Sequence, residues 1–224
     1  MVLHLNGGVC ALLIAPNLIG PALHAEPAEL GTVVSSIERR YNSLATLKIR
    51  FQQIMQFVAR PPLTEEGTLY LLRPSKMRWD YTRPQGKLLV GDGEMLHMYN
   101  PRANQVRQVK PSETGDLRAP LSFLLGRLRL RRQFSNLRLS DAGDQTLLIA
   151  DGRSGKEAYT RVEFRYDPED YRLLGLKVFG QDESVTIFRF EDEQVNSKLD
   201  PALFVFQPPA GADLIDGPWG KGDR

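Results

Sequence analysis

The chain has 224 residues, 42% of them hydrophobic, a length that buries one large core or two small ones. Its 29 basic and 27 acidic residues leave a net charge of +2, which is too small to argue for nucleic acid or another polyanion as partner. The one cysteine, Cys10, and two of the three histidines precede residue 26. Disulfides, cysteine-based zinc sites and most histidine-dependent hydrolytic mechanisms are therefore excluded from the rest of the chain.

Residues 1–25 are typical of a secretory signal. They contain no acidic residue, lysine or arginine, and most positions between 9 and 23 are apolar. The sequence "ALHA" ends at Ala25, so we expect cleavage after that residue and a mature domain over residues 26–224. An uncleaved membrane anchor is the alternative, but the run is short for a span and is broken by Pro16 and Pro21.

An amphipathic helix is predicted over residues 28–44. Pro27 stands where a helix can begin, and Glu38, Arg39 and Arg40 fall away from the apolar stripe. The stripe itself has spacings of three and four and consists of Leu30, Val33, Val34, Ile37, Tyr41 and Leu44.

The apolar period changes to two after Thr46, as expected for a strand. Further short strands follow, separated by turns rich in proline and glycine: "GTLYLLR", "KMRWDY", "KLLVGDG", "MLHMYN" and "NQVRQVK". This spacing leaves no room for crossover helices, so an antiparallel meander is predicted.

The strand pattern stops between Lys110 and Phe134. The segment "APLSFLLG" places a dense apolar group behind Pro120 and predicts a second short helix. Arginines then alternate with leucines in "RLRLRR", residues 127–132. We interpret these arginines as a solvated basic edge in preference to a docking site.

Strands resume in "NLRLSD", "QTLLIAD", "TRVEFRYD", "LLGLKVFG" and "SVTIFRFED", and a last extended piece is expected in "LFVFQPPAG". About ten or eleven strands against two or three short helices give a mainly β (α+β) domain. A flat open sheet of that size would curl or split. We therefore expect one strongly curved antiparallel sheet, with the helices over its apolar concave side.

Motifs for catalysis are weak. "DGRSGKE", residues 151–157, lacks the spacing of a phosphate-binding loop, and nothing brings the acidic pairs at strand ends together. His97, in "MLHMYN", is expected to be half-buried with a backbone partner. We predict no enzymatic activity, no catalytic residue, no metal site and no cofactor.

Large apolar and aromatic side chains recur along the predicted strands. They are compatible with an ordinary core and equally with the lining of a cavity that accepts lipid. The proposed lining consists of Phe51, Leu69, Leu71, Met77, Trp79, Met95, Tyr99, Phe164, Phe188 and Phe190.

Four segments in this order, "LRPSKMRWDYTRP", "LLVGDGEMLHMYNP", "PLSFLLG" and "FVFQPPAG", resemble the periplasmic outer-membrane lipoprotein carrier family of the LolA type. The resemblance covers nearly all of the mature chain. It implies an open half-barrel whose helices form a lid over a cavity for the acyl chains of lipoproteins. It also implies cargo transfer from an inner-membrane ABC release complex to an outer-membrane receptor, by a periplasmic protein that we expect to be a monomer.

In the same family the arginine of the Arg-Pro motif hydrogen-bonds to the lid backbone, and Arg73 matches it. The lid residues carried over in this way are Leu30, Val34, Ile37, Leu121, Leu124 and Leu125. Two positions depart from the family pattern, since Met77 stands where Phe or Leu is common and His97 where Trp is common. These departures change the fit to a particular cargo.

Three alternatives remain open. A membrane-anchored receptor of the same fold would need a lipidated cysteine at the mature start. A sensor module that binds mislocalised lipoproteins, or another lipid or glycolipid, and regulates a membrane-bound anti-sigma factor would carry a further C-terminal domain, whereas this chain ends soon after Pro209. An enzyme of lipid or glycan metabolism would place His97 or an acid pair inside a cleft.

Overall fold

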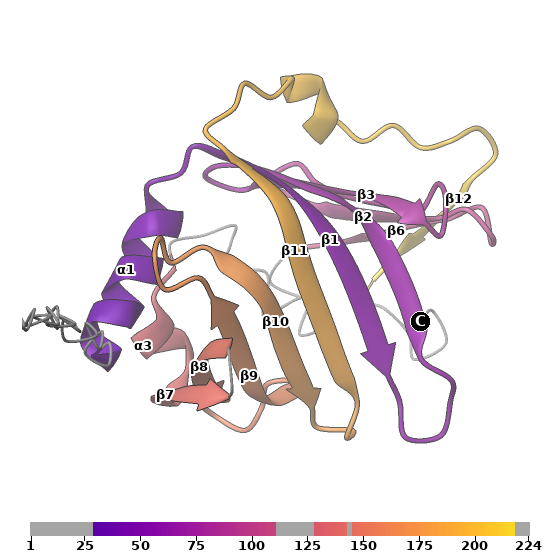
Figure 1. Ribbon diagram of the computed structural model, residues 1–224. Coiled ribbons are helices and arrows are strands. Elements are labelled where there is room, and N and C mark those ends of the chain that lie inside the picture. Colours follow the sequence, from indigo (N-terminus) through magenta and orange to yellow (C-terminus); the bar gives the residue numbers. More distant parts are fainter. Residues whose placement is uncertain (1–28, 111–127, 143–144, 218–224) are drawn as a thin grey trace, which may run out of the picture.

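Twelve strands form one open, curved sheet in the computed structural model, which describes residues 29–110, 128–142 and 145–217 (Figure 1). The predicted signal and the second predicted helix lie outside the described residues. The strands are β1 (Thr46–Gln56), β2 (Leu63–Leu72), β3 (Lys76–Arg83), β4 (Leu88–Gly91), β5 (Leu96–Asn100), β6 (Gln105–Val109), β7 (Ser135–Ala142), β8 (Gln145–Asp151), β9 (Tyr159–Tyr166), β10 (Leu173–Gly180), β11 (Val185–Val195) and β12 (Asp213–Asp216).

Two meanders make up the sheet. The order β12-β6-β5-β4-β3-β2-β1-β11-β10-β9-β8-β7 places β1 to β6 on one side of a central seam and β7 to β11 on the other. The seam is the antiparallel pairing of β1 with β11, in which Phe51 lies opposite Phe190. The predicted curved antiparallel meander is confirmed, with the difference that the last strand, β12, pairs with β6 in parallel.

Helix α1 (Leu30–Asn42) begins and ends within two residues of the predicted bounds. Its stripe is buried at Val33, Val34, Ile37 and Tyr41, and these side chains join the apolar cluster of the sheet. Arg39 and Arg40 lie in the last turn, where positive charge favours the carbonyl end of a helix. We call the sheet face that α1 covers the inner face, and the opposite one the outer face.

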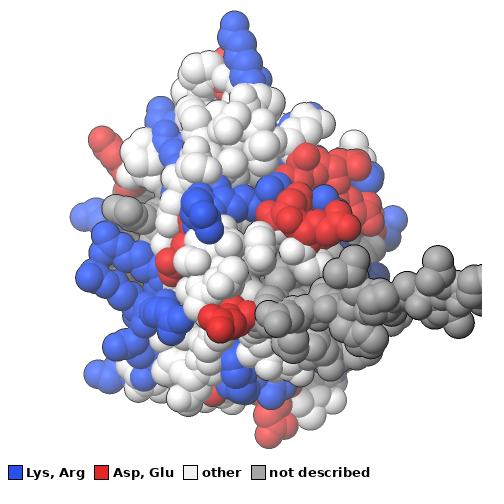
Figure 2. Space-filling view, turned by 60° about the vertical axis from the view of Figure 1, so that its left-hand side comes forward, with Lys and Arg blue, Asp and Glu red and all other residues white. Residues whose placement is uncertain are grey.

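The basic segment folds as a short helix, α3 (Leu130–Gln133), where an edge was expected. Leu128 and Leu130 are buried, while Arg129, Arg131 and Arg132 are exposed, as the alternation predicts. Figure 2 shows lysines and arginines along one flank of the molecule and a compact acidic group on the other. This view therefore carries charges of both signs.

The C-terminal segment crosses the outer face. The predicted extended piece contains a 3-10 helix, η2 (Pro201–Phe204), and the chain then continues to β12 at the edge of the sheet (Figure 1). Arg78 of β3 donates through Nη1 to the carbonyl of Leu203 at 3.0 Å. Phe204 is fully buried, as are Val90 and Val106, and none of the three belongs to the inner-face cluster.

Gly67 is required by close backbone approach. It lies between Phe51 and Tyr81 in the register, and a Cβ at this position would stand 2.1 Å from the carbonyl oxygen of Asp80. We expect Gly67→Ala to lower the free energy of unfolding by about 1–3 kcal/mol, because backbone must move to accept the methyl group.

Gly31→Ala is the matched control, measured by denaturant unfolding. Gly31 is exposed in α1, and within the described residues its added Cβ would meet a single arginine side-chain atom, at 4.0 Å. Alanine there should raise stability by up to about 1 kcal/mol, since it is the better helix former. Equal effects of the two substitutions would contradict the close approach at Gly67.

Candidate functional site

The inner face of the central strands carries an apolar and aromatic cluster. Successive rungs of the sheet pair Leu71 with Met77 and Leu69 with Trp79. The rings of Phe51 and Trp79 lie 4.7 Å apart, edge to face, a favourable arrangement for aromatic pairs. Strand alternation thus gathers side chains from β1, β2, β3 and β11 on one surface.

Eight of the ten predicted lining residues belong to this single buried cluster: Phe51, Leu69, Leu71, Met77, Trp79, Phe164, Phe188 and Phe190. The structure brings them together as proposed. Whether acyl chains enter among them stays a prediction.

Met95 and Tyr99 lie outside the cluster. Met95 falls in the turn before β5, and β5 has the opposite phase to the one we assumed. Leu96 and Met98 face the cluster, whereas the Tyr99 hydroxyl donates to Asn104 Oδ1 at 3.1 Å. A turn that ends one residue later than expected exchanges the two faces of a strand.

A buried ion pair on the inner face was missed by the sequence reasoning. Glu65 of β2 is only 4% exposed, and Lys87 Nζ lies 2.6 and 2.7 Å from its two carboxylate oxygens. Lys87 also lies over the ring of Tyr81, 4.5 Å from the centroid. The alternation Glu65, Gly67, Leu69, Leu71 along β2 was the available signal, since it puts the carboxylate on the apolar side.

The predicted lid residues divide into two groups. Val34 and Ile37 of α1 are buried in the cluster, and Leu30 packs against it. The others, Leu121, Leu124 and Leu125, fall outside the described residues.

Arg73 contacts the helix that covers the inner face. Its Nη2 donates to the carbonyl oxygen of Tyr41 at 2.6 Å, and its backbone N–H donates to the carbonyl oxygen of Ala45 at 3.0 Å. Burial lowers the pKa of Arg73, as expected when a cation leaves water. The guanidinium is thus a partly desolvated group that fastens the last turn of α1 to the start of the β2–β3 turn.

Tyr41 connects α1 to the opposite half of the sheet. Its hydroxyl donates to Glu193 Oε2 at 2.9 Å and accepts from the backbone N–H of Leu173 at 2.8 Å. Arg40 pairs with the other oxygen of Glu193. Burial, and then the charge of Glu193, raises the pKa of Tyr41, so its phenol stays protonated and remains a donor.

Helix α1 also holds the chain that follows residue 127. Asn42 exchanges two hydrogen bonds with Leu128, donating to its carbonyl at 2.9 Å and accepting from its N–H at 2.7 Å. The N–H of Leu130, at the start of α3, donates to Glu38 Oε1 at 2.7 Å. A displacement of α1 would therefore break contacts with this segment and with both halves of the sheet.

His97 lies on the outer face. Its ring stacks on Phe206 of the C-terminal segment at 4.8 Å, and Nε2 lies 3.3 Å from Asp92 Oδ2. Burial raises the pKa of Asp92, but hydrogen bonds from the N–H groups of Met95 and Glu94 and from His97 outweigh it and lower the pKa. Among the described residues no cluster of three metal-binding side chains is found.

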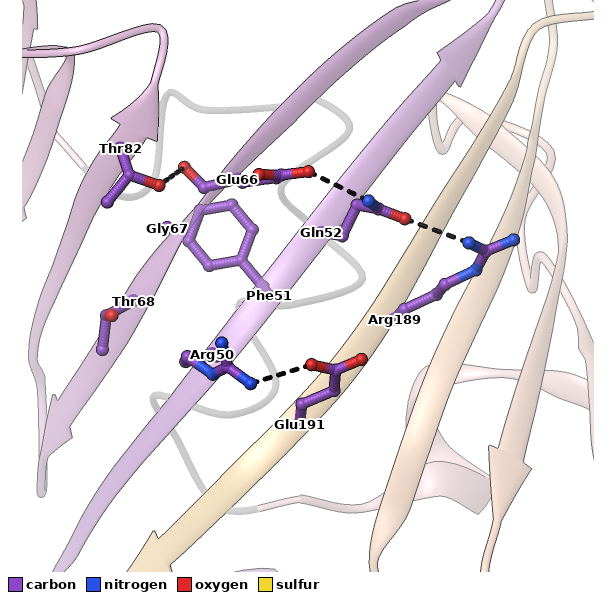
Figure 3. A pocket seen from close by; sticks show the side chains of 9 residues that line it. All are labelled: Arg50, Phe51, Gln52, Glu66, Gly67, Thr68, Thr82, Arg189 and Glu191. Carbon is purple, nitrogen blue, oxygen red and sulfur yellow. Dashed lines mark hydrogen bonds and ion pairs between the residues drawn. The ribbon is translucent and has the colours of Figure 1, made fainter.

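A polar pocket of about 470 Å³ opens across β11, β1, β2 and β3. Figure 3 shows its hydrogen-bonded rows, in which Arg189 contacts Gln52, Gln52 contacts Glu66, and Arg50 pairs with Glu191. Its full lining is Arg50, Phe51, Gln52, Glu66, Gly67, Thr68, Thr82, Arg189 and Glu191. Such a charged surface is unsuited to fatty chains and contrasts with the inner face.

Fold and site together define a class of protein, an open half-barrel with an apolar inner face covered by helix. The family model described as "Outer membrane lipoprotein carrier protein LolA" matches residues 42–207. The chain belongs to this family.

Individual relatives agree with the assignment. An outer-membrane lipoprotein carrier protein of Dechloromonas aromatica is 33% identical over 76% of this chain and 81% of its own. One of Chromobacterium violaceum is 29% identical over 92% and 95%. A solved structure of an uncharacterised conserved protein from Thermus thermophilus covers 82% of this chain and 96% of its own, with TM-score 0.52 and 14% identity, which supports the fold alone.

The hydroxyl of Tyr41 can be tested by Tyr41→Phe, which leaves the N–H of Leu173 buried without its acceptor. We expect the free energy of unfolding to fall by about 1–3 kcal/mol. Tyr70→Phe is the control, because no hydrogen bond of the Tyr70 hydroxyl is found within the described residues, and it should change stability by less than about 0.5 kcal/mol. Similar losses from both variants, measured in urea, would argue against the role of Tyr41.

Proposed function

We propose that this protein is a periplasmic chaperone that binds the acyl chains of lipoproteins on the inner face of its curved sheet. It takes them from an ABC release complex in the inner membrane and delivers them to a receptor at the outer membrane. Membership of the carrier family over residues 42–207 carries the proposal. The buried aromatic cluster that side chains of α1 join supports it.

Physical chemistry sets the requirement for such a carrier. Each methylene group moved out of water is worth about 0.8 kcal/mol, so one chain of roughly 14 carbons represents about 11 kcal/mol. A lipoprotein therefore does not leave a membrane for water unaided. The carrier must supply an apolar surface of comparable worth and still release its cargo.

Arg73 favours release in this proposal. When α1 moves to admit cargo, the guanidinium loses the Tyr41 carbonyl while it is still partly buried. A hydrogen bond to a charged group is worth about 1.5–3 kcal/mol, and its loss in the loaded state offsets part of the acyl-chain binding energy. Cargo binding is weakened by this amount, and transfer is favoured by it.

No helix within the described ranges is long and apolar enough to cross a membrane. The carrier acts as a monomer without a cofactor or enzymatic step. His97 is covered by Phe206 on the outer face, away from the inner-face cluster that binds cargo here. The exposed Arg129, Arg131 and Arg132 remain a solvated face.

Arg73→Leu should retain cargo and deliver it poorly. Without the Arg73 hydrogen bond, cargo binding is no longer weakened by about 1.5–3 kcal/mol. We therefore expect transfer to the receptor to be at least about tenfold slower. The measurement is transfer of a labelled lipoprotein from purified loaded protein to receptor in solution. Arg138→Leu is the matched control, because within the described residues the guanidinium of Arg138 binds Asp151 and the carbonyl of Asn136, neither of which belongs to α1. Normal transfer by the Arg73 variant would refute the latch.

Native mass spectrometry of protein purified from a bacterial periplasm tests the cargo itself. We expect a bound acylated peptide that dissociates only when the protein is unfolded or extracted with organic solvent. Free fatty acid or glycolipid as the sole bound species would contradict lipoprotein transport and support a lipid-binding module of the same fold.

A further inference from the structure

The indole nitrogen of Trp79 is a buried donor in the middle of the apolar inner face. Trp79 is 4% exposed, and its Nε1 has no hydrogen-bond partner within the described part of the chain. Rings surround it, with centroids 4.7 Å away at Phe51, 6.2 Å at Phe188 and 6.4 Å at Tyr81. A buried N–H left without an acceptor is unfavourable and rare in native proteins, so it needs a physical reason.

Trp79 also stands at a boundary between apolar and polar surface. On one side, the next rung of β2 and β3 pairs Leu71 with Met77. On the other side, Tyr81 stacks on Trp79, Lys87 lies over Tyr81, and Glu65 holds Lys87. Along the strands the inner face thus changes from aliphatic to aromatic to charged side chains. We call the aromatic part, Trp79 and Tyr81, the aromatic step, and the indole N–H of Trp79 lies there.

An acyl cargo has the complementary chemistry. Its tails contain no hydrogen-bonding group, and where a tail is ester-linked its first polar atom is a carbonyl oxygen, which is an acceptor only. The indole N–H is a donor only. A tail that lies along Leu71 and Met77 places its carbonyl end beside the aromatic step and its polar end toward Glu65 and Lys87.

We propose that Trp79 is a specificity-determining residue for the cargo, and that its indole N–H donates to the carbonyl oxygen of an ester-linked acyl chain. This inference rests on the proposed carrier function and deepens it. A site built to hydrogen-bond one group discriminates against an analogue that lacks it, because the protein donor is then left buried and unpaired. In the protein without cargo the indole N–H is unpaired within the described residues, which costs free energy, and an ester-linked lipid removes this cost by accepting its hydrogen bond.

Two synthetic ligands test the proposal on the purified full-length protein. One is a diacylglyceryl-cysteinyl peptide with ester-linked chains, and the other is its dialkyl ether analogue with chains of equal length. Their dissociation constants are compared by displacement of a fluorescent fatty-acid probe. We expect the ester to bind about tenfold more tightly, in line with one hydrogen bond formed in an apolar site.

Two variants assign the preference to the indole. Trp79→Phe keeps a ring but removes the donor, so it should bind both ligands with nearly equal affinity. Phe51→Leu is the matched control, because it replaces the neighbouring ring by a smaller side chain without touching a polar atom. It should weaken both ligands by a similar factor and keep the tenfold ratio.

The outcomes distinguish failure of this inference from failure of the carrier function. Equal affinities in the unaltered protein, or a preserved ester preference in Trp79→Phe, overturn the role of Trp79 and leave lipid binding intact. If neither ligand binds the unaltered protein, the carrier proposal fails, and the inference fails with it. Equal affinities in the unaltered protein overturn the inference even if the Trp79 variant does not fold.

Discussion

The hydrogen bond from Arg73 to the carbonyl of Tyr41 joins the last turn of α1 to the turn between β2 and β3. It acts together with the Tyr41 hydroxyl, which binds β10 and β11 from the same residue. One residue of the helix is thereby joined to both sides of the β1–β11 seam. The magnitudes show why such a bond suits a carrier: a few kcal/mol cannot outweigh the roughly 11 kcal/mol of one acyl chain, but it shifts a transfer equilibrium by about ten- to a hundredfold.

On β1, β2 and β3 the two faces of the sheet differ in chemistry because successive side chains alternate between them. Arg50 and Gln52 belong to the hydrogen-bonded rows on the polar side, while Phe51, between them in sequence, belongs to the aromatic cluster. Glu65 departs from this pattern, since it is a carboxylate on the apolar side. A buried ion pair is weak evidence for stability. The Glu65–Lys87 pair lies beside Tyr81, whose ring stacks on Trp79.

Much of this arrangement follows from local pattern, and the remainder depends on register. The period of α1 and the alternation in β1, β2 and β3 identified their buried faces, and eight of ten proposed lining residues share one cluster. Met95 and Tyr99 were misplaced because a single residue in the preceding turn sets the phase of β5. The Glu65–Lys87 pair joins positions 22 residues apart across β2 and the β3–β4 turn, which no local window contains. Family resemblance predicted only that Arg73 binds the lid backbone, and no sequence spacing points to the carbonyl of Tyr41 that the structure shows as its acceptor.

Strand β12 has a consequence for self-association. An open sheet exposes unpaired backbone groups at each edge. Pairing of these edges between copies of the chain leads to aggregation, which would prevent a lipoprotein carrier from working. At the β6 edge, four residues from the end of the chain occupy the available hydrogen bonds in parallel orientation. Two of them, Asp213 and Asp216, are exposed aspartates. A short edge strand with two exposed carboxylates disfavours the addition of another strand, because pairing would bury or juxtapose these charges. It therefore opposes polymerisation at this edge of the sheet.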